Sequence, residues 1–170
     1  VGDIHTQQHH LHWDVKMVNS KHLSFNFVPP FLRKSSLVKN YVTTPDEDLR
    51  CSGFVELDAQ RLDWEQAPGM RGHLAGPKNG HSWVWGHCNS FVDEQGNPSD
   101  LVVDALSARA RLGKNQASPT LTTCFFHYRK QSYTLCSLWG ALTTASQHSD
   151  AGWQFFVRCG RCQSVSLTVQ

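Results

Sequence analysis

The sequence predicts an all-β fold with antiparallel strands, and three observations support this prediction. Apolar and polar residues alternate with a period of two from one end of the chain to the other. Apolar residues at the spacing of an amphipathic helix hardly occur, so we expect at most one or two short helical turns. Turns rich in Gly, Pro, Asn and Asp separate about nine or ten short apolar segments, which favours a meandering barrel or sandwich.

The first predicted element is a hairpin. Leu11–Val18 alternates apolar with polar side chains, and Leu23–Phe27 places apolar residues on one face after a turn at residues 19–21. These two segments are predicted to pair. Residues 28–48 contain Pro29-Pro30, which disrupts regular strand pairing, so this stretch is predicted to be a loop with apolar content.

The remaining predicted elements are also strands. Ser52–Leu57 and Arg61–Trp64 flank a turn at residues 58–60 and are predicted to form a second hairpin. The later strand segments are Ser82–Phe91, Leu101–Leu112, Leu121–Tyr128, Tyr133–Trp139, Trp153–Cys159 and Gln163–Val169.

The length and charge of the chain limit its possible functions. At 170 residues the chain has the size of one domain with one sizeable core. The net charge of +2 is spread without long blocks, so no nucleic-acid partner is expected. No apolar run is long enough to span a bilayer as a helix. The start at Val1 and the strand-like end predict a processed chain or a piece of a larger protein.

Two groups of residues raise the question of metal binding. Cys159 and Cys162 have the CxxC spacing of redox and zinc sites, although the intervening Gly-Arg is typical of a turn between strands. His10 and His12 would project from the same face of a strand, beside His5 and His9. This geometry can bind Zn²⁺ or Cu²⁺ if another segment supplies a third ligand, but a solvated start of the first strand explains it more simply. No metal site and no cofactor are therefore predicted.

Several common catalytic motifs are absent from the sequence. There is no Gly-rich phosphate loop, no GxSxG elbow and no HExxH motif. Their absence argues against nucleotide enzymes, serine hydrolases of the α/β class and zinc metalloproteases of the HExxH class.

The stretch GHSWVWGHCNSF at residues 80–91 is the strongest functional signal. If Ser82–Phe91 is a strand, one face is small and the other carries large aromatic and hydrogen-bonding side chains. Such a face suits the interior of a ligand-binding barrel. An ordinary core, in which each indole and imidazole finds a local partner, is the competing interpretation. The large face consists of Trp83, Trp85, His87, Asn89 and Phe91.

The run from Gly53 to Leu112 resembles the lipocalin-like superfamily that includes tocopherol cyclase, carotenoid 1,2-hydratase, the AttH proteins and fungal Diels–Alderases. The resemblance rests on the hairpin that ends near Trp64, the loop HLAGPKNG, the strand HSWVWGHCNSF and the following DLVVDALSARARL. It implies a lipocalin-like (calycin) β-barrel, with a β-sandwich as the alternative.

Members of that superfamily contain two barrels in one longer chain. Residues 1–170 have length for one barrel, which predicts one half of a two-barrel protein. A second barrel or a homodimer would then complete the site.

The resemblance also implies a small hydrophobic ligand of the terpenoid or polyene type. In the enzymes it implies acid-assisted cyclisation, hydration or isomerisation at a carbon–carbon double bond. Such chemistry needs an acid in a dry pocket and aromatic faces to stabilise a carbocation. We expect His87 and Asp104 to be the catalytic pair. The expected ligand-binding residues are His81, Trp83, Trp85, Asn89, Phe91 and His127.

Two alternatives belong to other functional classes. The first is a lipocalin-like carrier that binds the ligand without chemistry. The second is a carbohydrate-binding β-sandwich, which would need Trp83 and Trp85 to be open to solvent so that they can stack on sugars.

Overall fold

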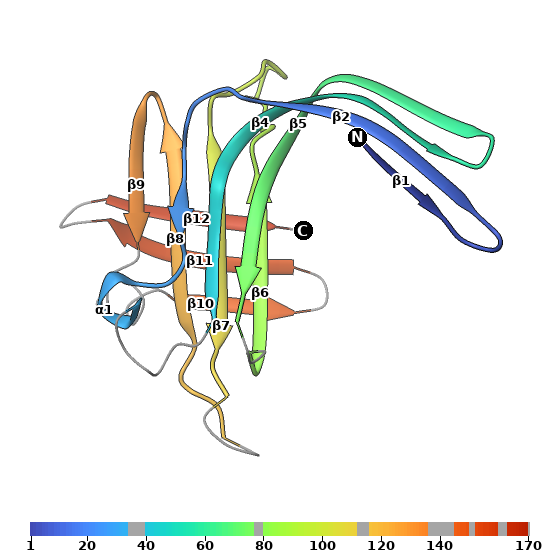
Figure 1. Ribbon diagram of the computed structural model, residues 1–170. Helices are drawn as coiled ribbons and strands as arrows, with labels where there is room; N and C mark the ends of the chain where they lie inside the picture. The colour runs from blue at the N-terminus through green and yellow to red at the C-terminus, as the bar shows by residue number, and fades with distance from the viewer. Residues whose placement is uncertain are drawn as a thin grey trace.

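The computed structural model describes residues 1–33, 40–76, 80–111, 116–135, 145–149, 152–159 and 163–169. Its strands form three sheets, and every strand pair is antiparallel (Figure 1). Within these ranges the single helix is α1 (Pro30–Arg33), which is one turn long. The prediction of an all-β, antiparallel fold is therefore confirmed.

The N-terminal sheet is built around one long strand. Its strands are β1 (Gly2–His5), β2 (His10–Asn19), β3 (Phe25–Asn26), β4 (Tyr41–Leu57) and β5 (Gln60–Ala75). The order is β1-β2-β4-β3, and β5 pairs with the other edge of β4. The tight connection between β4 and β5 confirms the turn predicted at residues 58–60.

The predicted pairing of Leu11–Val18 with Leu23–Phe27 is wrong. β2 pairs with the second half of β4, from Leu11 opposite Leu57 to Asn19 opposite Leu49. β3 pairs with the beginning of the same strand, where Phe25 lies opposite Thr44. β4 is long enough for both segments to lie along it one after the other, so each pairs with β4.

The predicted loop at residues 28–48 is also partly wrong, because β4 begins at Tyr41. Pro45 lies within this strand, where its missing N–H would break a regular ladder. The pairing with β5 shifts register between Thr43 and Asp46 and again between Asp46 and Leu49. A bulge accommodates a proline that a regular strand would not.

The central sheet is a regular meander. Its first three strands fall within predicted segments, whereas its fourth begins at Gln131, before the predicted start at Tyr133. Its order is β6-β7-β8-β9, and no register shift interrupts the first two pairings. The strands are β6 (Ser82–Cys88), β7 (Val102–Arg109), β8 (Leu121–Tyr128) and β9 (Gln131–Leu135).

The C-terminal sheet has the order β10-β11-β12. Its strands are β10 (Ala145–Ser149), β11 (Gly152–Cys159) and β12 (Gln163–Val169). Residues 136–139 of the predicted strand Tyr133–Trp139 lie outside the described residues, as do Leu37 and Val38 of the predicted loop. The CxxC prediction also falls there, because Cys162 is not described.

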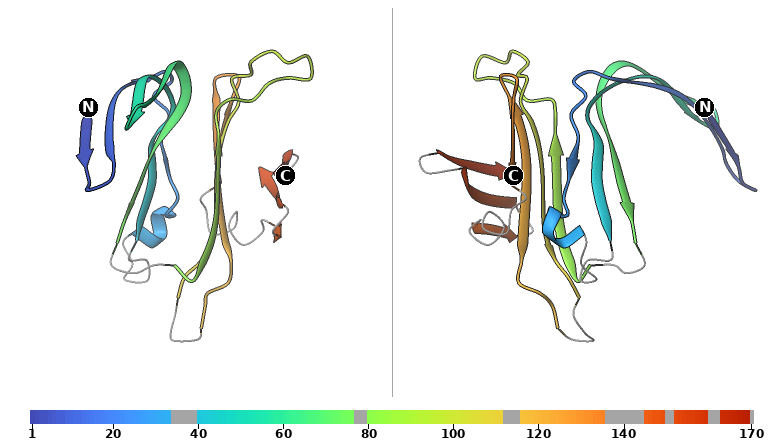
Figure 2. Two further views of the ribbon diagram at one scale, coloured as in Figure 1. Left: turned by 90° about the vertical axis from the view of Figure 1, so that its right-hand side faces the viewer. Right: turned by 60° about the vertical axis from the view of Figure 1, so that its left-hand side comes forward.

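The three sheets form layers. Figure 2 shows the central sheet between the N-terminal sheet and the C-terminal sheet, whose strands run across those of the central sheet (Figure 1). One buried cluster, of Phe25, Phe27 and Phe125, joins the N-terminal and central sheets. A second cluster, around Ala105 and Cys124, lies on the opposite face of the central sheet. In the described part of the chain the sheets stay open and form no closed barrel.

A search of the described residues for membrane-spanning helices found none with the required length and apolar character.

Candidate functional site

A group of buried ionisable side chains lies between the N-terminal and central sheets. Glu47 comes from β4, His87 from β6 and Asp104 from β7. Glu47 and Asp104 are 0% exposed, and the side chain of His87 is 10% exposed. One carboxylate oxygen of Glu47, one of Asp104 and one imidazole nitrogen of His87 all lie within 4.8 Å of one another. Carboxylates are almost never fully buried without a partner, so this group is the first candidate for a functional site.

Strand register brings His87 and Asp104 together. The two residues are directly opposite each other in the β6–β7 pair. Opposite residues project from the same face of a sheet, and here that face is the one toward β4. The Thr44 hydroxyl of β4 donates a hydrogen bond of 2.7 Å to Asp104 Oδ2. The site therefore spans both sheets.

Glu47 reaches the site through the irregular part of β4. Glu47 and Asp48 are consecutive and both are fully buried, whereas consecutive residues of a regular strand point to opposite faces. The register shifts on either side of Asp46 alter this alternation. As a result Glu47 Oε2 lies 3.3 Å from His87 Nδ1, and Asp104 Oδ2 lies 4.0 Å from the same nitrogen.

Asp48 has a different environment from Glu47. Lys21 Nζ and Arg50 Nη1 each lie 3.3 Å from an oxygen of Asp48, and the Asn89 amide donates a bond of 3.2 Å. Two cations therefore neutralise Asp48. Among the described residues no Lys or Arg pairs with Glu47, and both of its oxygens are buried without a hydrogen bond to any of them.

This difference controls where a proton is held. Burial, together with repulsion by the charge of Asp104, raises the pKa of Glu47 from 4.5 to about 10. Burial also raises the pKa of Asp104, against the lowering effect of its bonds from Thr44 and Trp85. Two adjacent buried carboxyl groups cannot both ionise easily, so the pair retains a proton at neutral pH.

The site favours the neutral form of His87. Burial lowers the pKa of its imidazole, although the charges of Asp104 and Asp48 act in the opposite direction. The sequence predicted His87 and Asp104 as the catalytic pair. The structure places Asp104 Oδ2 4.0 Å from His87 Nδ1, and burial favours a neutral imidazole and a protonated carboxyl pair.

Side-chain exposure falls along the face of β6 that carries Trp83, Trp85 and His87. Trp83 is 64% exposed and Trp85 is 43% exposed, whereas His87 and Asn89 are covered. The prediction that Trp83 points to the interior is therefore wrong, and that for Trp85 is only partly met. The N-terminal sheet covers the end of β6 but leaves its beginning open.

Trp85 connects this open region with the buried acids. Its indole N–H donates a hydrogen bond of 2.7 Å to Asp104 Oδ1 while its ring remains partly in solvent. Leu74 of β5 pairs with Val42, which packs against the phenylalanine cluster, so Leu74 also faces the central sheet. Leu74 is exposed like the two tryptophans. We call Leu74, Trp83 and Trp85 the aromatic mouth.

Asn89 supports the buried site. Its amide donates to the Gly69 carbonyl at 2.8 Å and, more weakly, to the Glu47 carbonyl at 3.4 Å. These bonds connect the end of β6 to β4 and β5. Asn89 thus holds the irregular part of β4 against the central sheet.

The other predicted ligand-binding residues lie elsewhere. Phe91 packs against the cluster around Ala105 on the opposite face, because β6 ends at Cys88 and the alternation stops there. His81 is exposed and precedes β6. His127 is buried, and its Nδ1 lies 2.9 Å from the hydroxyl of Ser132 on β9.

Sequence reasoning missed Glu47 and Thr44. The signal was the acidic run at residues 46–48, which follows the strand-like residues 41–44. Pro45 and the predicted loop concealed it. Acidic residues within a strand could have identified the site, because an acidic side chain is buried only where a partner or a bound proton neutralises its charge.

A cavity of about 600 Å³ lies at another place, near α1 and the edge of β3. Its size suits a small molecule. It does not include the buried acids or the aromatic mouth. It is lined by Ser24, Phe25, Asn26, Pro30, Arg33, Tyr41, Thr43 and Thr134.

Trp85→Ala should lower the free energy of unfolding by about 1–3 kcal/mol, because it removes the hydrogen bond to Asp104 and part of a half-exposed ring. This is less than the roughly 3–5 kcal/mol expected for a fully packed tryptophan. Urea unfolding measures the difference. Trp83→Ala is the matched control and should cost clearly less, since its ring is more exposed. A larger loss for Trp83 would contradict the face assignment.

Comparisons of the chain with protein-family models, with curated proteins and with solved structures found no match.

Proposed function

We propose that the chain binds a small apolar ligand of the terpenoid or polyene type at the aromatic mouth and protonates it. The reaction class is acid-assisted cyclisation, hydration or isomerisation at a carbon–carbon double bond. The observation that carries the proposal is the burial of Glu47 beside Asp104, which raises the pKa of Glu47 to about 10. A carboxylic acid that keeps its proton at neutral pH is suited to general acid catalysis.

The geometry suggests a role for each group. The Glu47–Asp104 pair donates its proton to one alkene carbon, and the π electrons form the new C–H bond, leaving a carbocation on the other carbon. The faces of Trp83 and Trp85 stabilise that cation. The cation then loses a proton from a neighbouring carbon, or adds water that loses one. Neutral His87, 3.3 Å from Glu47, accepts this proton and returns it to the carboxyl pair.

Asp104 also connects Trp85 of the aromatic mouth with Glu47. Bonds from Thr44 and from the Trp85 indole fix its carboxylate. In this proposal the N-terminal and central sheets are two walls of a lipocalin-like barrel. A second barrel or a second copy of the chain would close it.

The test is conversion of a panel of isoprenoid alkenes and polyenes, with products identified by mass spectrometry. The parent protein should form cyclised, hydrated or isomerised products, and Glu47→Gln should form none. Glu56→Gln is the matched control, because Glu56 lies on the same strand near the surface and is paired with Arg61. It should behave like the parent.

Other outcomes would reject parts of the proposal. Equal rates for the parent and Glu47→Gln would remove Glu47 from the mechanism, and equal rates for His87→Gln would remove His87. A parent protein that retains an apolar ligand but converts nothing on the panel would be a binding module instead.

A second candidate function is carbohydrate binding, which the 64% exposure of Trp83 favours. Exposed aromatic rings can stack on the apolar faces of sugars. Titration with a panel of oligosaccharides, followed by tryptophan fluorescence, tests this candidate. Saturable binding that Trp83→Ala abolishes and Glu47→Gln leaves unchanged would support it over the acid chemistry.

A further inference from the structure

A second group of ionisable residues lies far along the N-terminal hairpin, apart from the buried site. His5 on β1 is directly opposite His10 on β2, and Asp3 is opposite His12. Residues two apart on a strand share a face, and opposite residues share it too. The four side chains therefore form a two-by-two square on one face of the β1–β2 ribbon.

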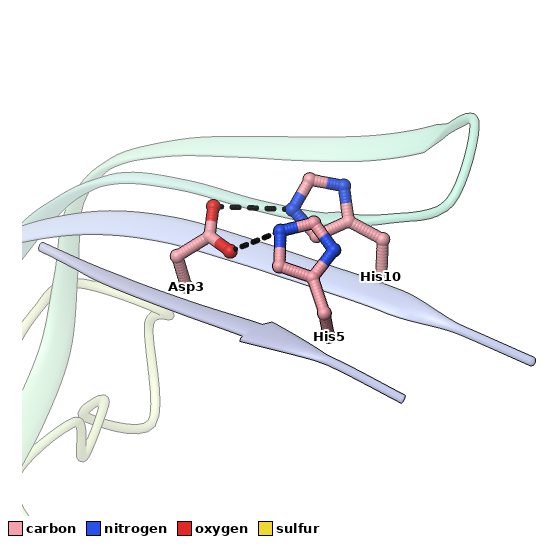
Figure 3. A group of neighbouring side chains, drawn as sticks. All are labelled: Asp3, His5 and His10. Atoms are coloured by element: carbon pink, nitrogen blue, oxygen red, sulfur yellow. Dashed lines mark hydrogen bonds and ion pairs between the residues drawn. The ribbon is translucent and has the colours of Figure 1, made fainter. Parts of the chain in front are cut away.

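Three imidazoles converge on one carboxylate in this square. His5 Nε2 lies 2.8 Å from Asp3 Oδ1, and His10 Nε2 lies 3.1 Å from Oδ2. His12 Nδ1 also lies 3.1 Å from Oδ2. Figure 3 shows His5 and His10 side by side with one contact to each oxygen of Asp3, and their rings stack with centroids 3.9 Å apart.

We propose that this square binds one divalent transition-metal ion of the type that prefers imidazole, such as Zn²⁺ or Cu²⁺. His5 and His10 would supply nitrogen ligands and Asp3 an oxygen, because one ligand atom of each residue already lies within 4.8 Å of those of the other two. A site that includes His10 of β2 needs ligands from another segment, and β1 supplies His5 and Asp3. Imidazole and carboxylate ligands are well suited to these ions.

The distances fit such an ion after a small movement. Ligand atoms of a tetrahedral Zn²⁺ lie about 3.4 Å apart, given bonds of roughly 2.0 to 2.1 Å. The nitrogen–oxygen distances of 2.8 to 3.1 Å in the square are slightly shorter. All four side chains are partly exposed, so they can move outward by this amount and water can complete the coordination.

Charge around the square also favours a cation. Glu56 of β4 lies opposite His12, although Arg61 partly neutralises it at 3.9 Å. An ion would join β1 to β2, and so add stability to a terminal strand that has only β2 as its partner in the described sheet.

The test is calorimetric titration of metal-free protein with Zn²⁺ and with Cu²⁺ in a buffer that does not bind metals. One ion should bind per chain. His5→Gln and His10→Gln should each weaken binding by at least tenfold. His9→Gln is the matched control: its ring contacts Asp58, outside the square, so binding should be unchanged.

The Cu²⁺ complex should also show coupling to more than one imidazole nitrogen in its electron paramagnetic resonance spectrum.

Three results would overturn the proposal. The first is no binding of either ion. The second is an equal loss in His9→Gln, which would mean unspecific binding to histidines. The third is binding that survives in His5→Gln and His10→Gln but disappears in His87→Gln, which would place the ion in the buried site.

Discussion

Glu47→Gln should raise the free energy of unfolding by roughly 3 kcal/mol at pH 7 and leave it almost unchanged near pH 4. The folded protein keeps a proton on Glu47 up to about pH 10, whereas the unfolded chain releases it near 4.5. Between these values the unfolded state binds fewer protons, so stability falls as the pH rises. Glutamine mimics the protonated acid and does not carry this cost.

Two neighbouring groups shape the same pH profile. The raised pKa of Asp104 acts in the same direction as that of Glu47. The lowered pKa of His87 acts in the opposite direction, because its contribution is lost as the pH falls below the ordinary value of 6.5. Above pH 6.5 the carboxyl pair dominates among these three groups, so the parent protein should lose stability there.

Urea unfolding at pH values from 4 to 9 measures this profile. Glu56→Gln provides the control, since Glu56 is partly exposed and paired with Arg61 at the surface. Its profile should run parallel to that of the parent. If Glu47→Gln also ran parallel to the parent, Glu47 would not hold a proton in the folded state.

Phe125→Ala should lower the free energy of unfolding by about 3–5 kcal/mol. Phe125 is buried between the N-terminal and central sheets, where its ring stacks on Phe25 with centroids 5.6 Å apart. It also lies opposite Asp104 in the β7–β8 pair. Truncation would leave a cavity beside Asp104, where Phe25 and Phe27 pack against the central sheet.

Phe126→Ala is the matched control for that change. Phe126 is the next residue on β8, points to the other face and is only partly buried, stacked on Tyr133. Its loss should be smaller. Equal losses in the two variants, measured by thermal and urea unfolding, would contradict the packing of the N-terminal sheet on the face of Phe125.

The part of the site that lies on the regular strands β6 and β7 could be predicted from the sequence. β6 and β7 pair without a bulge, so simple alternation placed His87 beside Trp85 and allowed Asp104 as its partner. Alternation failed for Phe91 because β6 ends three residues earlier. Burial along β6 also depends on which sheet covers it, and this information is absent from a local pattern.

The other part could not be found in this way. Glu47 lies in a strand with a proline and two register shifts, and a period of two does not describe such a segment. The pairing of β4 with β2, β3 and β5 joins residues far apart in the chain. The raised pKa of Glu47 depends on that pairing, since it arises from burial and from Asp104 on another sheet.

Whether Glu47 keeps its proton at neutral pH can be measured by titration of its side-chain carboxyl carbon, followed by ¹³C nuclear magnetic resonance. Comparison with Glu47→Gln assigns the signal. We expect this carboxyl to remain protonated through pH 8, far above its ordinary pKa of 4.5. A Glu47 signal that titrates near 4.5 would contradict this expectation.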